Sequence, residues 1–96
     1  NNAKLVQSES VETIGKLLVY PNPTTSLATI EFESTTECEG QLTIIDMMGK
    51  KVYNKVVKIE GGKNSLVLDL SNIVSGIYSV QLNYSGLTFY QNVVVQ

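Results

Sequence analysis

The chain consists of short stretches in which apolar and polar residues alternate, separated by turn-forming residues roughly every 8 to 12 positions. In residues 28–33, for example, Ala28, Ile30 and Phe32 alternate with threonine and glutamate. A period of two places successive side chains on opposite faces of an extended strand, so that one face is buried and the other solvated. No stretch of convincing length has the period of a helix, roughly 3.6 residues. The sequence therefore predicts an all-β protein.

Turn signals divide this pattern into about seven strands. Proline cannot donate to a ladder, so Pro21 and Pro23 end the first strand, and further turns are expected at residues 46–50, 61–64 and 85–86. Asp46 and Asp69 are expected to cap turns and strand ends. The expected strands are residues 16–20, 28–33, 41–45, 51–59 and 66–70, and a final hairpin of residues 76–82 and 87–96.

The alternation slips in residues 51–59. Val52 and Val56 share one parity, whereas Tyr53, Val57 and Ile59 share the other. Such a slip is typical of a β-bulge or of a strand at the edge of a sheet, and either is expected here.

The number and spacing of the strands favour an antiparallel Ig-like β-sandwich over a barrel. The cysteine pair and the tryptophan that antibody domains bury are absent, since the chain has one cysteine and no tryptophan. The prediction therefore concerns the sandwich architecture alone. In the final hairpin, Tyr78, Val80, Leu82 and Tyr84 share one face, with Tyr78, Val80 and Leu82 expected to face the core. The matching parity of the second strand is Leu87, Phe89, Val93 and Val95.

The length of 96 residues corresponds to one domain. Residues 1–16 show no sustained period and resemble a linker, so we assign the folded domain to residues 17–96. The chain begins without methionine, and its two methionines, Met47 and Met48, lie mid-chain. We interpret the sequence as a fragment of a longer protein.

Several classes of function are disfavoured by composition. The formal net charge is −2 and the seven basic residues are scattered lysines, so no basic stripe is available for nucleic acid. No apolar run approaches the roughly 20 residues of a transmembrane helix. Without histidine, neither Cys38 nor a serine can form the usual nucleophile–imidazole pair, and we expect neither an enzyme nor a cofactor.

The remaining candidate sites have simpler explanations. The glutamates at positions 31, 33, 37 and 39 lack the loop of a calcium site and are expected to form a solvated face. Cys38 is expected in the polar loop of residues 34–40. Asn83-Tyr84-Ser85 matches the N-glycosylation pattern, although a turn role explains Asn83. Tyr53 and Tyr90 stay open as sugar-stacking candidates.

Four segments occur in a characteristic order: residues 19–23, 44–52, 68–80 and the final 93–96. In this order and position they resemble the C-terminal sorting domain of the type IX (Por) secretion system of Bacteroidota, over residues 17–96. Members often carry lysines around the last apolar residues, whereas Gln91, Asn92 and Gln96 stand there in this chain. The motif and candidate recognition residues are Tyr20, Pro21, Asn22, Pro23, Asp46, Gly49, Gly76, Tyr78, Val80, Val93, Val94, Val95 and Gln96.

The resemblance implies a domain that follows a cargo protein, folds in the periplasm and is recognised by the outer-membrane translocon and its shuttle protein. It further implies that a sortase-like cysteine peptidase removes the domain, within residues 1–16 here, and attaches the cargo to the cell surface. No basic tail is available for recognition, so we expect the hairpin of residues 76–82 and 87–96 to be read, with its uncharged end prominent.

A terminal hairpin can present backbone N–H and C=O groups to a partner strand by β-augmentation. The same edge makes a dimer by strand pairing possible. The rival interpretation is an Ig-like adhesion or carbohydrate-binding module of a surface protein, which would be retained on its cargo. The sequence leaves both interpretations open.

Overall fold

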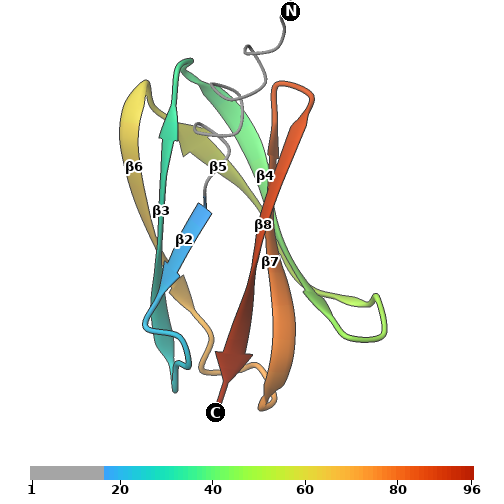
Figure 1. Cartoon of the computed structure of the whole chain (residues 1–96). Coiled ribbons are helices and arrows are strands. Elements are labelled where there is room, and N and C mark those ends of the chain that lie inside the picture. The colour runs from blue at the N-terminus through green and yellow to red at the C-terminus, as the bar shows by residue number, and fades with distance from the viewer. Residues whose placement is uncertain (1–16) are drawn as a thin grey trace, which may run out of the picture.

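The computed structural model describes residues 17–96, so the linker and cleavage region predicted for residues 1–16 lie outside the described part. These residues form seven strands and no helix (Figure 1). The strands are β2 (Leu17–Tyr20), β3 (Leu27–Ser34), β4 (Cys38–Asp46), β5 (Lys51–Ile59), β6 (Gly62–Asp69), β7 (Gly76–Tyr84) and β8 (Leu87–Val95).

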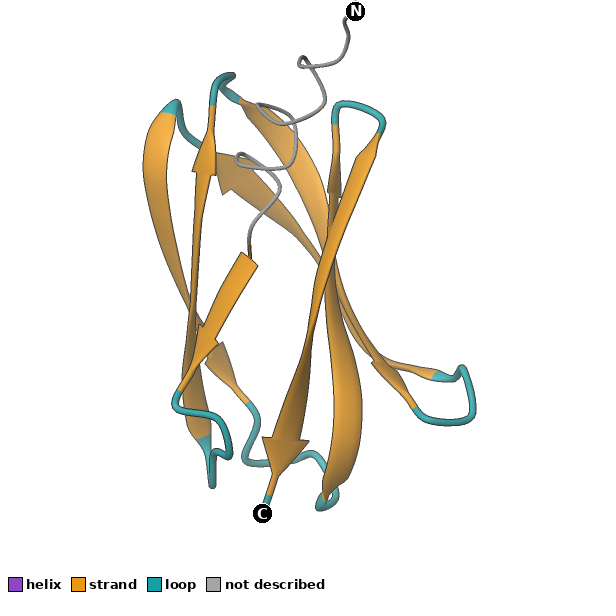
Figure 2. Ribbon diagram, viewed as in Figure 1, coloured by secondary structure: helices purple, strands orange, loops and turns teal. Residues whose placement is uncertain are grey.

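The strands form two antiparallel sheets that face each other as a sandwich, with most of the turns at its ends (Figure 2). One sheet has the order β2-β3-β6 and the other the order β5-β4-β7-β8. The prediction of an all-β, Ig-like antiparallel sandwich is thereby confirmed.

Apolar side chains of alternate positions fill the space between the sheets, because the period of two directs them all to the same face. Tyr78, Val80 and Leu82 of β7 are buried, as are Val93 and Val95 of β8, which confirms the predicted inward face for these residues. Leu87, at the start of β8, is instead 38% exposed. The most deeply buried large side chains come from both sheets and are Ile30, Leu42, Ile44, Ile59, Leu68, Leu70, Leu82, Val80 and Val93.

Strand β5 is both bulged and at an edge, as its slipping alternation predicted. The register with β4 passes from Ile44 opposite Tyr53 to Ile45 opposite Lys51, which leaves Val52 as the extra residue. The far end of the β4–β5 hairpin projects away from the body of the sandwich (Figure 1). Val57 and Ile59 nevertheless lie in the core because they occupy the inward parity nearer the other end of β5.

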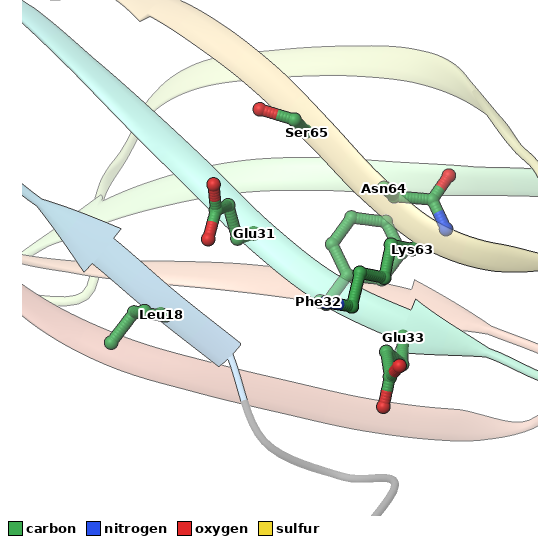
Figure 3. Close-up of a pocket in the computed structure, with 7 residues that line it drawn as sticks. All are labelled: Leu18, Glu31, Phe32, Glu33, Lys63, Asn64 and Ser65. Carbon is green, nitrogen blue, oxygen red and sulfur yellow. The ribbon is translucent and has the colours of Figure 1, made fainter.

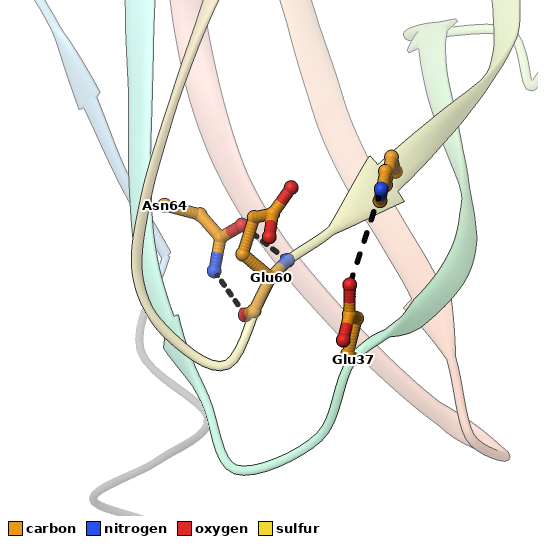
Figure 4. Close-up of polar contacts among 4 residues, drawn as sticks. Glu37, Glu60 and Asn64 are labelled. Atoms are coloured by element: carbon orange, nitrogen blue, oxygen red, sulfur yellow. Dashed lines mark hydrogen bonds and ion pairs between the residues drawn. The ribbon is translucent and has the colours of Figure 1, made fainter.

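Two local predictions were wrong. The loop predicted for residues 34–40 is shorter, because Ser34 ends β3, and Cys38, Glu39 and Gly40 belong to β4, where they pair with β5. A Cβ at Gly40 would lie 2.5 Å from Ile59 Cδ1, so glycine suits this close approach within the strand. Gly62, Lys63 and Asn64 belong to β6 rather than to the turn predicted for residues 61–64. The Asn64 side chain instead closes a tighter turn: its Oδ1 accepts the Glu60 N–H at 2.9 Å and its Nδ2 donates to the Glu60 carbonyl at 3.0 Å (Figure 4).

Candidate recognition edge

Residues 21–24, here called the latch, cross from the end of β2 to the edge of β8. The side-chain amide of Asn22 accepts a hydrogen bond from the Val94 N–H and donates one to the Asn92 carbonyl, both at 2.9 Å. The backbone of Thr24 donates its N–H to the Val94 carbonyl at 2.9 Å and accepts the Gln96 N–H at 2.8 Å. Thr24 and Val95 thereby form a parallel bridge. The latch connects the two sheets at the C-terminal end of β8.

These bonds also fix the direction of the other backbone N–H and C=O groups along the edge of β8. In an antiparallel pair, alternate residues direct both backbone groups toward the same neighbour. Because Val94 directs its N–H and C=O away from β7, Thr88 and Tyr90 do the same. Within residues 17–96 no strand pairs with β8 on that side, and the latch reaches only Asn92. Thr88 and Tyr90 therefore form an open half of the edge, beside a latched half.

The other edge strands of the described residues are protected against pairing with a foreign strand. Strand β5 carries Lys51, Lys55 and Lys58 together with its bulge, and charges and bulges both discourage edge pairing. Strand β6 has Lys63 and Asp69 near its two ends, and β2 has four residues. Strand β8, in contrast, has nine residues and no charge. Among these edges it is the best suited to accept another strand.

The predicted motif at residues 46–50 is a rigid turn at the tip of the projecting hairpin. Asp46 Oδ1 accepts the N–H groups of Met48 and Lys50 at 2.9 and 2.8 Å, and the Asp46 carbonyl accepts the Gly49 N–H at 3.0 Å. Gly49 has a φ of 87°, which glycine adopts without strain. The turn-capping role predicted for Asp46 is confirmed. This turn is not adjacent to the β8 edge, since β4 and β7 separate β5 from β8.

The predicted residues of the hairpin are divided between core and edge. Tyr78 packs beside Gly76, where an added Cβ would lie 3.5 Å from its ring, and its hydroxyl donates to the Val74 carbonyl. Val80, Val93 and Val95 are core residues, Val94 is half-buried, and Gln96 is exposed. The backbone groups of Val94 and the Gln96 N–H that face the edge are occupied by the latch, so the uncharged chain end is masked there.

The first of the four predicted segments, residues 19–23 and here called the entry motif, lies next to this edge. Tyr20, Pro21, Asn22 and Pro23 have exposed side chains, and the two X–Pro peptide bonds are cis. Sequence reasoning missed Thr24, which is 2% exposed. It included Thr88 and Tyr90 in the hairpin expected to be read, and Tyr90 among the sugar-stacking candidates, but it did not single out the two as an open pair. The absence of charged residues in β8 was a sequence signal that could have indicated an open edge at Thr88 and Tyr90. No sequence signal indicated the bridge between Thr24 and Val95.

A model of the secretion-system C-terminal sorting domain, the Por secretion tail, matches residues 18–96. The chain belongs to this family. Membership indicates a sorting signal for type IX secretion, and it implies an interaction with the type IX machinery and export to the cell surface or the medium. The resemblance drawn from the motif order is confirmed at this level. No curated protein matches the sorting domain.

The acidic residues of the sorting domain do not converge. Glu31 and Glu33 face an open hollow on the outer side of the β2-β3-β6 sheet, together with Leu18, Lys63 and Ser65 (Figure 3). Within residues 17–96 no group of at least 3 acidic or cysteine side chains is placed to hold a metal ion. Tyr20 donates its hydroxyl to Glu31, and this hydrogen bond, with smaller contributions from desolvation and the negative charge of Glu31, raises the pKa of Tyr20.

Glu37, directly before β4, forms an exposed ion pair with Lys58 near the end of β5. Lys58 Nζ lies 3.9 Å from Glu37 Oε2, beside the Asn64 turn (Figure 4). Both side chains are well exposed, so this pair contributes little to stability.

Cys38 and the surface tyrosines show no catalytic arrangement. The Cys38 Sγ is half-buried and lies 3.7 Å from Thr36 Oγ1 and 3.8 Å from Ser85 Oγ. Tyr53 is half-buried, whereas Tyr90 is 67% exposed on the outer side of β8. The sorting-domain family is not a catalytic one, and the described residues contain no helix long and apolar enough to cross a membrane.

Proposed function

We propose that this domain directs a preceding cargo protein through the type IX outer-membrane translocon and that the β7–β8 hairpin is the surface read there. The family match over residues 18–96 carries this proposal. In the proposed sequence of events the domain folds in the periplasm and is carried by a shuttle protein to the translocon. A sortase-like cysteine peptidase then cuts within residues 1–16 and attaches the cargo to the surface.

The properties of the β8 edge support recognition by strand addition. A partner strand needs unpaired backbone donors and acceptors, and Thr88 and Tyr90 direct theirs toward the open side of β8. No charged side chain of β8 opposes an approaching strand. The core beneath it is fixed by Val80, Leu82 and Val93, so the edge is presented by a rigid scaffold. Recognition then depends on backbone geometry more than on a charged tail.

A fluorescent reporter fused before residue 1 tests the proposal in a bacterium with the type IX system and in a strain that lacks its translocon. We expect surface or extracellular reporter in the first strain and periplasmic reporter in the second. The deletion of residues 93–96 is a poor probe because it removes Val93 and Val95 from the core. The Thr88→Pro/Tyr90→Pro variant is better, since it removes two edge-facing donors without removing a donor to β7.

The matched control is Thr88→Val/Tyr90→Phe, which changes the same side chains and keeps both N–H groups. We expect the proline variant to stay in the periplasm and the control to be exported. Far-UV circular dichroism and thermal unfolding verify that both variants fold. Export of a folded proline variant at the level of the control would reject recognition at the β8 edge.

The rival function, an adhesion or carbohydrate-binding module, is favoured by the exposed ring of Tyr90 alone. It predicts that the domain stays attached to its cargo at the cell surface. Mass spectrometry of the exported cargo distinguishes the two functions. A new C-terminus within residues 1–16 supports the sorting function, and a cargo that retains the domain supports an adhesion or carbohydrate-binding module.

A further inference from the structure

The latch resembles a strand in only part of its bonding. Pro21 and Pro23 have no N–H, so the backbone around Asn22 cannot form a continuous ladder with β8. The Asn22 side chain replaces it: a primary amide has one acceptor and two donors, and it accepts from Val94 and donates to Asn92 as a peptide group would. Thr24 supplies the remaining two bonds through its backbone. The latch is therefore a partial substitute for a paired strand.

The attachment of the latch is shallow. Pro21, Asn22 and Pro23 are exposed, and Thr24 is the one buried side chain among residues 21–24. Thr24 Oγ1 donates to the carbonyl of Leu27 at the start of β3, at 2.7 Å, and not to β8. Leu17 and Val19 hold β2 in the core independently of these bonds. Detachment of the latch therefore breaks four hydrogen bonds to residues 92–96 without opening the core.

A true strand on the same edge would satisfy more of β8 than the latch does. The latch bonds Asn92, Val94 and Gln96 and leaves the edge-facing groups of Thr88 and Tyr90 without a partner among the described residues. A strand that pairs first with Thr88 and Tyr90 can extend along β8 and replace each latch bond with a ladder bond. The incoming strand gains the bonds of the open half and replaces those of the latched half, and what the domain gives up is the burial of Thr24.

We propose that the open half of β8 is a starting point for an extended partner strand, and that this strand then displaces the latch of residues 21–24 to pair with the whole of β8. The partner belongs to the export machinery, so the inference rests on the proposed sorting function. Asn22 acts by masking the edge and is not itself read. The entry motif therefore acts in the opposite direction to a recognition motif: a substitution that weakens the latch is expected to ease docking, whereas loss of a recognition residue would impair it.

The first measurement is amide hydrogen exchange of the full chain of 96 residues, without any partner. Asn22→Ala removes both side-chain bonds, and the control Thr25→Ala changes an exposed neighbour on the same loop. We expect exchange of the Val94 and Gln96 N–H groups to rise about tenfold in Asn22→Ala, a factor typical of losing one or two hydrogen bonds, with Val93 unchanged. Equal acceleration across β8 would show that the core opens with the latch and would overturn the proposal.

The second measurement is export of the reporter fusion. We expect Asn22→Ala to be exported at least as well as Thr25→Ala, whereas a recognition role for Asn22 predicts loss of export and would overturn the proposal. A disulfide lock tests the converse: Thr24→Cys/Val95→Cys in a Cys38→Ser background joins the bridged pair. The two single-cysteine variants in that background are its controls.

We expect the locked domain to fold and to stay in the periplasm while both single-cysteine controls are exported. Export of the oxidised lock at the level of the controls would overturn displacement of the latch. Failure of the sorting function can be distinguished from failure of latch displacement. If the domain is not a sorting signal, the unmodified domain is not exported either, whereas the hydrogen-exchange result does not depend on export.

Discussion

The N–H of Val94 donates to the side-chain Oδ1 of Asn22 at 2.9 Å, across a sequence separation of 72 residues. The Nδ2 of the same asparagine donates to the Asn92 carbonyl. One side chain from the start of the domain therefore completes the ladder of its last strand. The stability of the C-terminal end of β8 depends on a residue that lies outside every strand.

Asn22→Ala should lower the free energy of unfolding by about 1–2 kcal/mol, because it removes two hydrogen bonds that are solvent-accessible and can be replaced by water. Urea denaturation of the full chain measures this change. Thr25→Ala should stay within about 0.5 kcal/mol of the unmodified domain, as is usual for exposed positions. Indistinguishable midpoints for both variants would show that the latch contributes nothing to stability.

Gly40→Ala should destabilise the domain by about 1–3 kcal/mol through overpacking. A Cβ at this position would lie 2.5 Å from Ile59 Cδ1 and 3.1 Å from the Asn83 carbonyl oxygen, and Ile59 is fully buried in the core. Gly61→Ala is the matched control, since no atom lies within 4 Å of its added Cβ. Thermal unfolding of the two variants should separate them, and equal melting temperatures would contradict the packing around Gly40.

Much of this fold could be predicted from the sequence, because a period of two is a local signal. It predicted the inward faces of β3, β7 and β8 and the irregularity of β5. Gly40 shows the limit of such a signal. Glycine ends many loops, but here it lies within β4 because Ile59 and Tyr84 occupy the space of a side chain, and those contacts arise from other strands.

The recognition edge could be predicted less well. The sequence indicated the β7–β8 hairpin but not the order β5-β4-β7-β8, which decides that β8 has a free side. The β4–β5 and β7–β8 hairpins pair consecutive strands, but the pairing of β4 with β7 that joins them is non-local, and no local pattern encodes it. The masking of Val94 and Gln96 by Asn22 and Thr24 is equally non-local, so the accessible part of β8 became clear from the structure alone.

The Asp69 carboxylate should contribute a pH-dependent term to stability. The side-chain hydroxyl of Ser71 donates to Asp69 Oδ1 at 2.7 Å, the Ser71 backbone N–H donates to the same oxygen at 3.0 Å, and these bonds lower the pKa of Asp69. A lowered folded pKa stabilises the fold above the unfolded pKa of about 3.9, and the contribution is lost as the pH falls through the folded value.

The substitution Asp69→Asn tests this contribution, because an amide does not titrate in the acidic range. Urea midpoints of the unmodified domain and of the variant are compared at a series of pH values. We expect the advantage of the unmodified domain to be constant near neutral pH and to shrink below about pH 4. A difference that stays constant down to about pH 2 would contradict the charge-assisted bonds.

The lysines of β5 should keep that edge from pairing with a second molecule. Strand β5 is as long as β8 and has exposed apolar side chains at Val52 and Val56, so its charges and bulge are what distinguish it. Lys55→Thr/Lys58→Thr should leave the fold intact, since the ion pair of Lys58 with Glu37 is exposed, and should increase concentration-dependent association measured by sedimentation velocity. The matched control Lys63→Thr changes one charge at the end of β6 and should associate less. If the β5 variant stays as monodisperse as the control, charge does not protect this edge, and the contrast with β8 must come from the bulge.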